Sequence, residues 1–252
     1  MSAAPDTPVV FIHIAKTAGT SLTRVLQEHL PADRLAVRTH RPLATLPTAD
    51  HARTVAVIRE PLDRLVSAFA WLGGRPSVLW RGAVGNPDLA AELGLDRFAG
   101  PADFLDHFDA FYDDHVRPWA DGLAAADRRL GDLMAFGHFN LFVPQHRYLV
   151  DARDDLAVGH LLRFEHLADD TAAWLDRVAP GHGPIVWPHL YPSRREPAAA
   201  LASPRALAAV RDIYAADYAL PGMAPSPAPI AAREPSPGLP PLARAVARAA
   251  AA

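Results

Sequence analysis

Residues 9–26 read VVFIHIAKTAGTSLTRVL and join two patterns of hydrophobicity through a short polar loop. An apolar run stops at Ala15, and apolar residues recur after the loop at the three- and four-residue spacing of a core-facing helix. The stretch therefore predicts a strand, a loop over residues 16–21 and a helix. Because the first N–H groups of a helix lack acceptors and lie at its positive end, we expect this loop to bind an anion.

Three kinds of side chain in the loop fit an anion site. Gly19 lets the backbone approach a ligand closely, and Thr20 or Ser21 can cap the helix and offer a hydroxyl group. Lys16 is the only lysine of the chain, whose 24 other basic side chains are all arginines. A lone lysine here indicates a need for a compact, flexible charge. The alternative is a solvated loop lysine without a role.

The composition limits the possible classes of protein. A chain of 252 residues, half of them hydrophobic, can bury one full core. It contains no cysteine, which excludes disulfides and thiolate chemistry. A net charge of −3 argues against a general nucleic-acid binder. Neither a leader segment nor a stretch of membrane-spanning length is visible, so we expect a cytoplasmic protein without a membrane partner.

Further strands and helices alternate along the chain. Residues 35–37, 54–58 and 160–164 are short apolar runs, and the run TVAVI at 54–58 does not alternate with polar residues, as in a strand buried on both faces. Helices are predicted after Pro61 and over residues 167–178. This order predicts an α/β fold with a P-loop-like central parallel sheet flanked by helices.

The rest of the chain is expected to form an insertion and a tail. Residues 73–100 are irregular and carry Trp80, a candidate for acceptor contact, whereas Trp71 is expected to be core. Further helices are predicted, with Phe104, Leu105, Phe108 and Phe111 facing inward; they span residues 101–123, 128–136 and 204–218, the last capped by Ser203. Residues 8–222 thus form a single domain, and the Pro- and Ala-rich residues 223–252 a disordered tail.

Polar residues follow three of the predicted strands. Lys16, His40 and Arg59 each come after an apolar run. Ligands of open parallel sheets bind outside the carboxyl ends of the strands, so these three residues should share one edge. Ser67 lies roughly 9 Å beyond Pro61 along the following helix, at 1.5 Å per residue. Arg59 and Ser67 could hold a second anionic group, as suits a nucleotide phosphorylated at two places.

Two motifs resemble those of a known family. FIHIAKTAGTSL (residues 11–22) resembles the 5′-phosphosulfate loop of sulfotransferases that use 3′-phosphoadenosine 5′-phosphosulfate (PAPS), in the form of the carbohydrate group with the uronyl 2-O-sulfotransferases. VIREPLDRLVSAF (57–69) resembles their 3′-phosphate motif, an arginine followed eight positions later by serine. Weaker similarities are PQHRYL (144–149), LLRFEHLADD (161–170) and IYAADYAL (213–220). Two departures are Ala15 in place of proline and Glu60 in place of Asp or Asn.

The resemblance implies roles for these residues. The phosphosulfate would bind Lys16 and the loop residues Thr17, Ala18, Gly19, Thr20 and Ser21, and the 3′-phosphate would bind Arg59 and Ser67. Arg194, beside Arg195, either closes over the 3′-phosphate or forms a solvated turn. A hydroxyl of a carbohydrate or hydroxylated small molecule would attack sulfur in line, while Lys16 stabilises the departing phosphate oxygen. The scheme needs no metal, and the chain lacks a recognised zinc motif.

Such transfer needs a general base near the acceptor hydroxyl. The resemblance points to His40, since in the uronyl 2-O-sulfotransferases a histidine just ahead of the 3′-phosphate strand has this role. An ordinary loop histidine is the alternative. His13, within the first strand, is expected to be a core group. Glu60 could replace His40, although its place beside Arg59 favours an ion pair.

Two other functions stay open at this level. A P-loop kinase or NTPase shares the strand, loop and helix, but GxxxxGK[ST] is absent because Lys16 precedes Gly19. A non-catalytic member of the fold would bind the nucleotide and transfer nothing. Nothing in the sequence predicts the acceptor or the oligomeric state.

Overall fold

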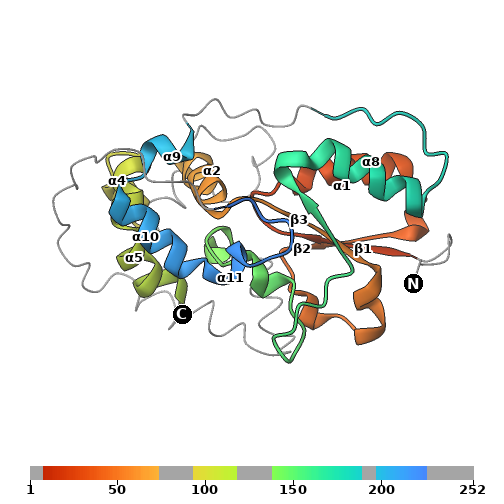
Figure 1. The fold of residues 1–252 in the computed structure, drawn as a ribbon, viewed down its shortest axis with the longest axis horizontal. Coiled ribbons are helices and arrows are strands. Elements are labelled where there is room, and N and C mark those ends of the chain that lie inside the picture. Colours follow the sequence, from red (N-terminus) through yellow and green to blue (C-terminus); the bar gives the residue numbers. More distant parts are fainter. Residues whose placement is uncertain (1–7, 74–92, 118–137, 189–196, 226–252) are drawn as a thin grey trace, which may run out of the picture.

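A parallel four-stranded sheet forms the centre of the protein in a computed structural model, which describes residues 8–73, 93–117, 138–188 and 197–225 (Figure 1). The strand order is β2-β1-β3-β4. Each neighbouring pair is parallel, and Val10 of β1 pairs with Ala36 on one side and Thr54 on the other. The predicted α/β fold with a parallel sheet is therefore confirmed. The strands are β1 (Val9–His13), β2 (Leu35–Thr39), β3 (Thr54–Ile58) and β4 (His160–Arg163).

The apolar runs do not alternate because both faces of the central strands are buried. Successive side chains of a strand point to opposite faces. Accordingly, Ile12 of β1 and Ala56 of β3 belong to one hydrophobic cluster, and Phe11 and Val55 belong to another. The sheet thus separates two cores.

Two long helices cover one face, called here the α1/α8 face. They are α1 (Gly19–His29) and α8 (Leu167–Val178), which lie together on the same side of the sheet in Figure 1. Leu22 and Leu26 of α1 and Leu175 of α8 are fully buried against Phe11 and its neighbours. The predicted helix at 167–178 has the bounds of α8.

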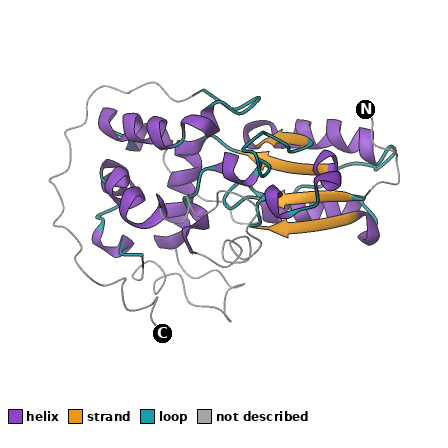
Figure 2. Ribbon diagram, turned by 90° about the horizontal axis from the view of Figure 1, so that it is seen from below, coloured by secondary structure: helices purple, strands orange, loops and turns teal. Residues whose placement is uncertain are grey.

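The other face packs against a group of helices, called here the helical lobe. The strand arrows point toward this lobe in Figure 2, so the carboxyl ends of the strands face it. Its helices are α2 (Pro61–Gly73), α4 (Pro101–Asp106), α5 (Phe108–Phe111), α9 (Ala198–Leu201), α10 (Pro204–Ile213) and α11 (Ala215–Tyr218). Single turns at His138–Leu141 and Gln145–Tyr148 complete it.

Aromatic rings fill the lobe. The four residues predicted to face inward from 101–123 are buried, and Phe104 contacts Phe108, Phe111 and Phe142 at centroid distances between 5.4 and 5.8 Å. The prediction of one continuous helix there is wrong. The chain leaves the helix at His107, whose ring lies 2.9 Å from the carbonyl of Asp103, and a π-helical turn at Tyr112–Val116 follows α5. The ring nitrogen Nδ1 is therefore within hydrogen-bond distance of the carbonyl that would accept from the backbone N–H of His107 in a continuous helix.

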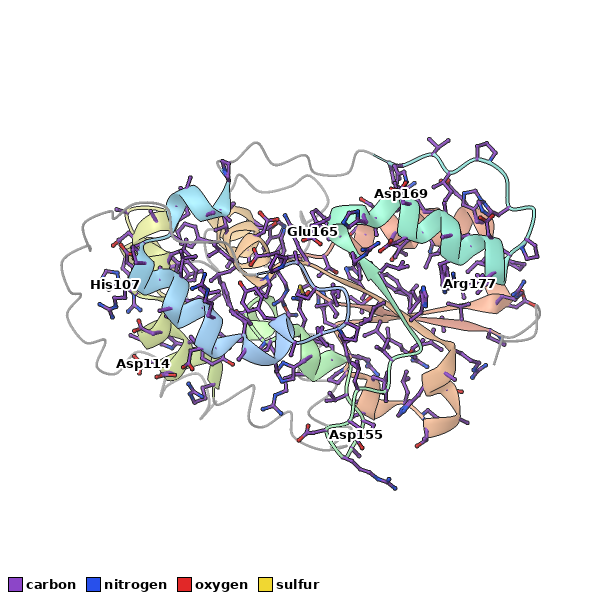
Figure 3. All side chains as sticks on the ribbon, viewed as in Figure 1. His107, Asp114, Asp155, Glu165, Asp169 and Arg177 are labelled. Carbon is purple, nitrogen blue, oxygen red and sulfur yellow. The ribbon has the colours of Figure 1, made fainter. Side chains whose placement is uncertain are left out.

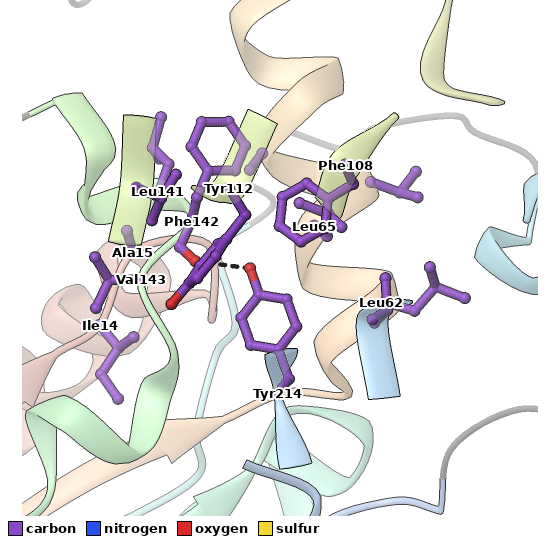
Figure 4. Close-up of a cluster of buried hydrophobic side chains, with 14 of the residues drawn as sticks. Ile14, Ala15, Leu62, Leu65, Phe108, Tyr112, Leu141, Phe142, Val143 and Tyr214 are labelled. Atoms are coloured by element: carbon purple, nitrogen blue, oxygen red, sulfur yellow. Dashed lines mark hydrogen bonds between the residues drawn. The ribbon is translucent and has the colours of Figure 1, made fainter. Parts of the chain in front are cut away.

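The predicted helix at 204–218 is likewise divided. Its start is confirmed, because the Ser203 hydroxyl accepts a hydrogen bond from the Ala206 N–H. The helix stops at Tyr214, whose hydroxyl donates to the carbonyl of Phe142 at 2.7 Å (Figure 4). The break between α10 and α11 thus coincides with a hydrogen bond from this buried tyrosine to a residue 72 positions earlier in the chain.

Several predictions fall outside the described residues. They concern the helix at 128–136, Trp80, the pair Arg194–Arg195, and the tail from residue 226 onward. Of the predicted tail, Met223 is described and packs on the lobe. Within the described ranges, every helix is too short or too polar to cross a membrane.

Candidate functional site

Lys16, His40 and Arg59 lie at the same edge of the sheet. His40 directly follows β2, Arg59 directly follows β3, and Lys16 comes three residues after β1. Since these strands are neighbours and parallel, their carboxyl ends meet at the edge that faces the helical lobe. Lys16 and His40 both have left-handed backbones, with φ of 67° and 54°. Such conformations cost non-glycine residues roughly 1–3 kcal/mol and collect at functional sites.

Two arginines hold the loop after β1 by donating hydrogen bonds to its backbone carbonyls. The Arg59 guanidinium donates from Nη1 to the carbonyl of Lys16 at 2.9 Å. The Arg64 guanidinium donates from Nε to the carbonyl of Ala15, also at 2.9 Å. The two sequence motifs are thus in direct contact through Arg59 and Lys16.

Not every predicted binding residue of the loop has an exposed side chain. Thr17 is fully buried, and its hydroxyl donates to the carbonyl of Ile14 at 3.0 Å. The prediction that Thr20 or Ser21 caps α1 is wrong. The helix starts earlier, at Gly19, and its N-cap is Ala18 with φ of 63°. Thr20 and Ser21 lie in the first turn, where the N–H groups have no acceptor within the helix.

Gly19 is needed for a reason that the sequence did not show. A Cβ atom at this position would lie 1.9 Å from Cδ2 of His13. The His13 ring stacks on Phe11 and occupies the space beside the start of α1. Absence of a side chain at Gly19 therefore makes room for His13.

One stripe of α2 faces the Lys16 loop. Asp63, Ser67 and Trp71 are spaced by four residues and so lie along one side of the helix. At one end of the stripe, Asp63 pairs with Arg59. At the other end, the Lys16 ammonium lies 5.3 Å from the centroid of the Trp71 ring, a cation–π distance. Trp71, predicted to be a core residue, is half-buried and contacts the candidate site.

Arg59 is nearly enclosed. It is 6% exposed, its guanidinium lies 3.9 Å from the centroid of the Phe164 ring, and Nη2 lies 2.6 Å from Asp63. Gln145 accepts from the Arg59 N–H at 2.9 Å and donates to the Arg59 carbonyl at 2.8 Å. The residue is therefore held by both its backbone and its side chain.

Asp217 holds Gln145 in turn. The carboxylate is fully buried in α11 and accepts from the backbone N–H groups of Gln145 and His146 at 2.7 and 2.8 Å. Two of the weaker motif similarities, 144–149 and 213–220, therefore meet behind Arg59.

Arg64 is a residue whose importance the sequence did not reveal. It is a charged residue of α2, yet it is 1% exposed. Besides Ala15, it donates to the carbonyls of Val143 and Asn140 at 2.9 and 3.2 Å. Because the guanidinium satisfies three carbonyls from two separate stretches, it joins the loop after β1 to the segment at 139–143.

His40 lies between two partners. Its ring meets the His13 ring edge to face at a centroid distance of 5.2 Å, and Nδ1 lies 3.0 Å from the Asn140 side-chain amide. Its backbone N–H donates to the carbonyl of His13 at 2.9 Å and so extends the pairing of β2 with β1.

The alternative bases are poorly suited to proton transfer. Burial, with a smaller contribution from His40, lowers the pKa of His13 to about 3, so this ring is neutral and weakly basic near pH 7. Burial raises the pKa of Glu60, but its carboxylate is occupied by the N–H groups of Leu62 and Asp63 and by the Tyr218 hydroxyl. Glu60 caps α2, and the ion pair of Arg59 is with Asp63, contrary to expectation.

The end of β4 also contacts this region. Glu165 lies where the sheet meets the helical lobe, and its carboxylate accepts from the Glu60 N–H at 2.9 Å (Figure 3). Among the described residues, no three His, Asp or Glu side chains are arranged to hold a metal ion. The candidate ligand-binding groups at this edge are the Lys16 ammonium, the loop backbone, the Arg59–Asp63 pair, Ser67 and His40, of which Arg59 and Ser67 are only 6% and 7% exposed.

These features define a parallel α/β protein with a candidate anion site at the carboxyl edge of its sheet. A scan against protein-family models and searches of curated proteins and of solved structures found no match.

Proposed function

We propose that the protein is a PAPS-dependent sulfotransferase with a P-loop-like nucleotide site, acting on a hydroxyl of a carbohydrate or hydroxylated small molecule. The observation that carries the proposal is the contact between Arg59 and the Lys16 carbonyl. It joins the loops that resemble the 5′-phosphosulfate and 3′-phosphate motifs, which supports a single nucleotide site that includes both loops. The resemblance supplies the donor, and the geometry agrees with it.

Each residue then has a chemical task. Lys16 and the first N–H groups of α1 bind the phosphosulfate and stabilise the charge on the departing phosphate oxygen. His40 takes the proton of the acceptor hydroxyl as its oxygen bonds to sulfur. The bond between sulfur and the phosphate oxygen breaks, and adenosine 3′,5′-bisphosphate leaves. Arg59 and Ser67 bind the 3′-phosphate, and positioning supplies much of the rate, as in phosphoryl transfer.

The Arg59–Asp63 ion pair affects how the 3′-phosphate would bind. The carboxylate compensates the guanidinium at 2.6 Å, so an arriving 3′-phosphate has to share Arg59 with Asp63. The proposal therefore expects Asp63 to weaken phosphate binding through like-charge repulsion.

Calorimetry tests the nucleotide. Wild-type protein should bind adenosine 3′,5′-bisphosphate more tightly than adenosine 5′-phosphate or ATP, and Arg59→Ala should remove this preference. Arg24→Ala serves as a matched control, because Arg24 is an exposed cation of α1. Tight binding of ATP without a preference for the 3′-phosphate would contradict the proposal and favour a kinase or NTPase.

Transfer of radiolabelled sulfate from PAPS to a panel of sugars and hydroxylated metabolites tests the reaction. His40→Ala should lower kcat while leaving nucleotide affinity unchanged, as general-base catalysis contributes about 10²–10⁴-fold. Binding of adenosine 3′,5′-bisphosphate without transfer to any acceptor would favour a non-catalytic member of the fold.

A further inference from the structure

Trp71 lies beside the Lys16 ammonium, and the proposal above gives it no task. We infer that Trp71 is a positioning residue for Lys16: its indole face draws the ammonium away from the Arg59 end of the site and holds it for the departing phosphate oxygen. This inference rests on the proposed role of Lys16 in transfer.

The backbone of Lys16 is fixed, whereas its side chain is long. The Lys16 carbonyl accepts from Arg59 at 2.9 Å, and the carbonyl of Ala15 before it accepts from Arg64 at the same distance. Four methylene groups separate this fixed backbone from the ammonium, and their rotamer freedom is lost when the ammonium acts at one point. A contact that orders the ammonium before the nucleotide binds lowers this cost.

The stripe of α2 sets the direction of the lysine side chain. Asp63 and Trp71 are separated by roughly 12 Å along the helix, at 1.5 Å per residue. The Arg59 guanidinium contacts both Asp63 and the Lys16 carbonyl, whereas the Lys16 ammonium lies 5.3 Å from the centroid of the Trp71 ring. The lysine side chain therefore extends from the Asp63 end of the stripe toward its Trp71 end. One cation is thus held at each end of the stripe, with Ser67 between them.

An aromatic face suits an ammonium that has to stabilise new negative charge. The quadrupole of an indole ring attracts a cation but carries no net charge, so the ammonium keeps its full charge for a phosphate oxygen. Arg59 differs in this respect, because the Asp63 carboxylate compensates its guanidinium. Trp71 is itself anchored, since it is half-buried and packs against the core of the helical lobe.

Nuclear magnetic resonance of the full chain with 13C-labelled lysine tests the contact without a transfer assay. Because Lys16 is the only lysine, the label gives one set of side-chain signals. Its Hε protons should lie upfield of those of a solvated lysine, since an aromatic ring shields protons above its face. Trp71→Leu should abolish this shift, and Trp71→Phe should keep part of it. An unshifted wild-type signal, or a shift that persists in Trp71→Leu, would overturn the inference.

Trp174→Leu is the matched control. Trp174 is a buried tryptophan of α8, on the opposite face of the sheet. Its truncation should lower the thermal stability and leave the lysine signal at the wild-type position. A change of the signal as large as in Trp71→Leu would mean that it reports general loosening of the fold, and the inference would fail.

Kinetics test the consequence for transfer. Trp71→Leu should lower kcat by about 3- to 30-fold, the loss expected for a partly desolvated cation–π contact, and should change KM for PAPS less. Trp71→Phe keeps an aromatic face, although a weaker one, and should retain more of the activity. Equal losses of kcat in the two variants would show that the ring face has no part in transfer and would reject the inference.

The two experiments separate this inference from the proposed function. If no sulfate is transferred to any acceptor while Trp71→Leu changes the lysine signal, the contact stands and the proposed reaction fails. If transfer is lost in Lys16→Ala while neither kcat nor the lysine signal responds to Trp71→Leu, the reaction stands and the inference fails.

Discussion

The two faces of the sheet are built from different chemistry. On the α1/α8 face, the buried contacts are mainly aliphatic, with Phe11 and Trp174 as the large rings. The helical lobe also buries charged and amide groups, among them Arg64, Asn140 and Asp217. Arg64 donates to the carbonyl of Ala15 beside Lys16, and Gln145, held by Asp217, bonds to the backbone of Arg59.

The difference assigns different tasks to the two faces. Apolar packing is non-directional and tolerates changes that preserve volume, so the α1/α8 face mainly supplies stability. Hydrogen-bonded networks specify angles and distances, and leaving one member unsatisfied is costly. The lobe thus fixes the geometry of the candidate site.

The largest effect should come from the site itself. Lys16→Ala should lower transfer by about 10³-fold, the upper range for loss of a group that stabilises developing charge. Arg24→Ala, on the exposed side of α1, should leave transfer within twofold or so of the wild type. The measurement is the single-turnover rate of sulfate transfer, and equal losses in both variants would remove the special role of Lys16.

Truncating one buried residue on each face tests the comparison directly. Leu26→Ala should lower the free energy of unfolding by about 2–5 kcal/mol and leave nucleotide affinity of the folded protein unchanged. Arg64→Met should cost about 3 kcal/mol because three buried carbonyls lose their donor. It should also weaken binding of adenosine 3′,5′-bisphosphate.

Urea unfolding and calorimetry at low temperature measure both quantities for this pair. A loss of nucleotide affinity in Leu26→Ala as large as in Arg64→Met would erase the distinction between the faces.

His13 is the titratable ring in contact with the α1/α8 core. The pKa of His13 is lowered to about 3 in the folded chain. Below about pH 6.5, His13 is therefore protonated in the unfolded chain and neutral in the folded chain. Because only the unfolded chain binds this proton, the free energy of unfolding of the wild type decreases as pH falls, by about 1.4 kcal/mol at pH 5.5. His13→Phe keeps a ring stacked on Phe11 and should remove this part of the acid sensitivity.

The measurement is the difference in unfolding free energy between pH 7.5 and 5.5 for both proteins. An identical pH dependence would show that the His13 ring is protonated when folded. Transfer should persist in the variant, since His40 is the proposed base.

The smallest effect concerns the Arg59–Asp63 pair. Asp63→Asn keeps an oxygen acceptor for Arg59 but removes its negative charge. Binding of adenosine 3′,5′-bisphosphate should tighten about fivefold at low salt, because a carboxylate no longer competes with the 3′-phosphate. Adenosine 5′-phosphate is the control ligand and should show no change. Weaker binding of the bisphosphate would mean that Asp63 orients Arg59 for the ligand.

Much of the fold was predictable because the strands and the helices that cover the sheet leave local patterns of apolar residues in the sequence. The strand at 54–58 and the helix at 167–178 have the predicted bounds. The second strand extends two residues further than predicted, to Thr39. The helices at 101–123 and 204–218 were predicted without their breaks at His107 and Tyr214, since each break coincides with one side chain taking a particular carbonyl.

For the candidate site, the rule for strand ends placed Lys16, His40 and Arg59 at one edge. The residues behind them could not be found in this way. Arg64 acts on a carbonyl 49 residues away, Gln145 on a backbone 86 residues away, and Asn140 on a ring 100 residues away. The motif similarity at 144–149 pointed to the Gln145 segment but not to its partner.

The sequence by itself determined the parallel sheet, the strand–loop–helix around the single lysine, and the polar residues at the ends of three strands. These follow from short unbroken apolar runs, from the helical hydrophobic period of 3.6 residues and from the geometry of parallel strands. Only the tertiary structure decided which side chains hold those residues in place. A hydrogen bond depends on distance in space, and Arg64, Asn140 and Gln145 reach their partners only after the helical lobe has folded against the sheet.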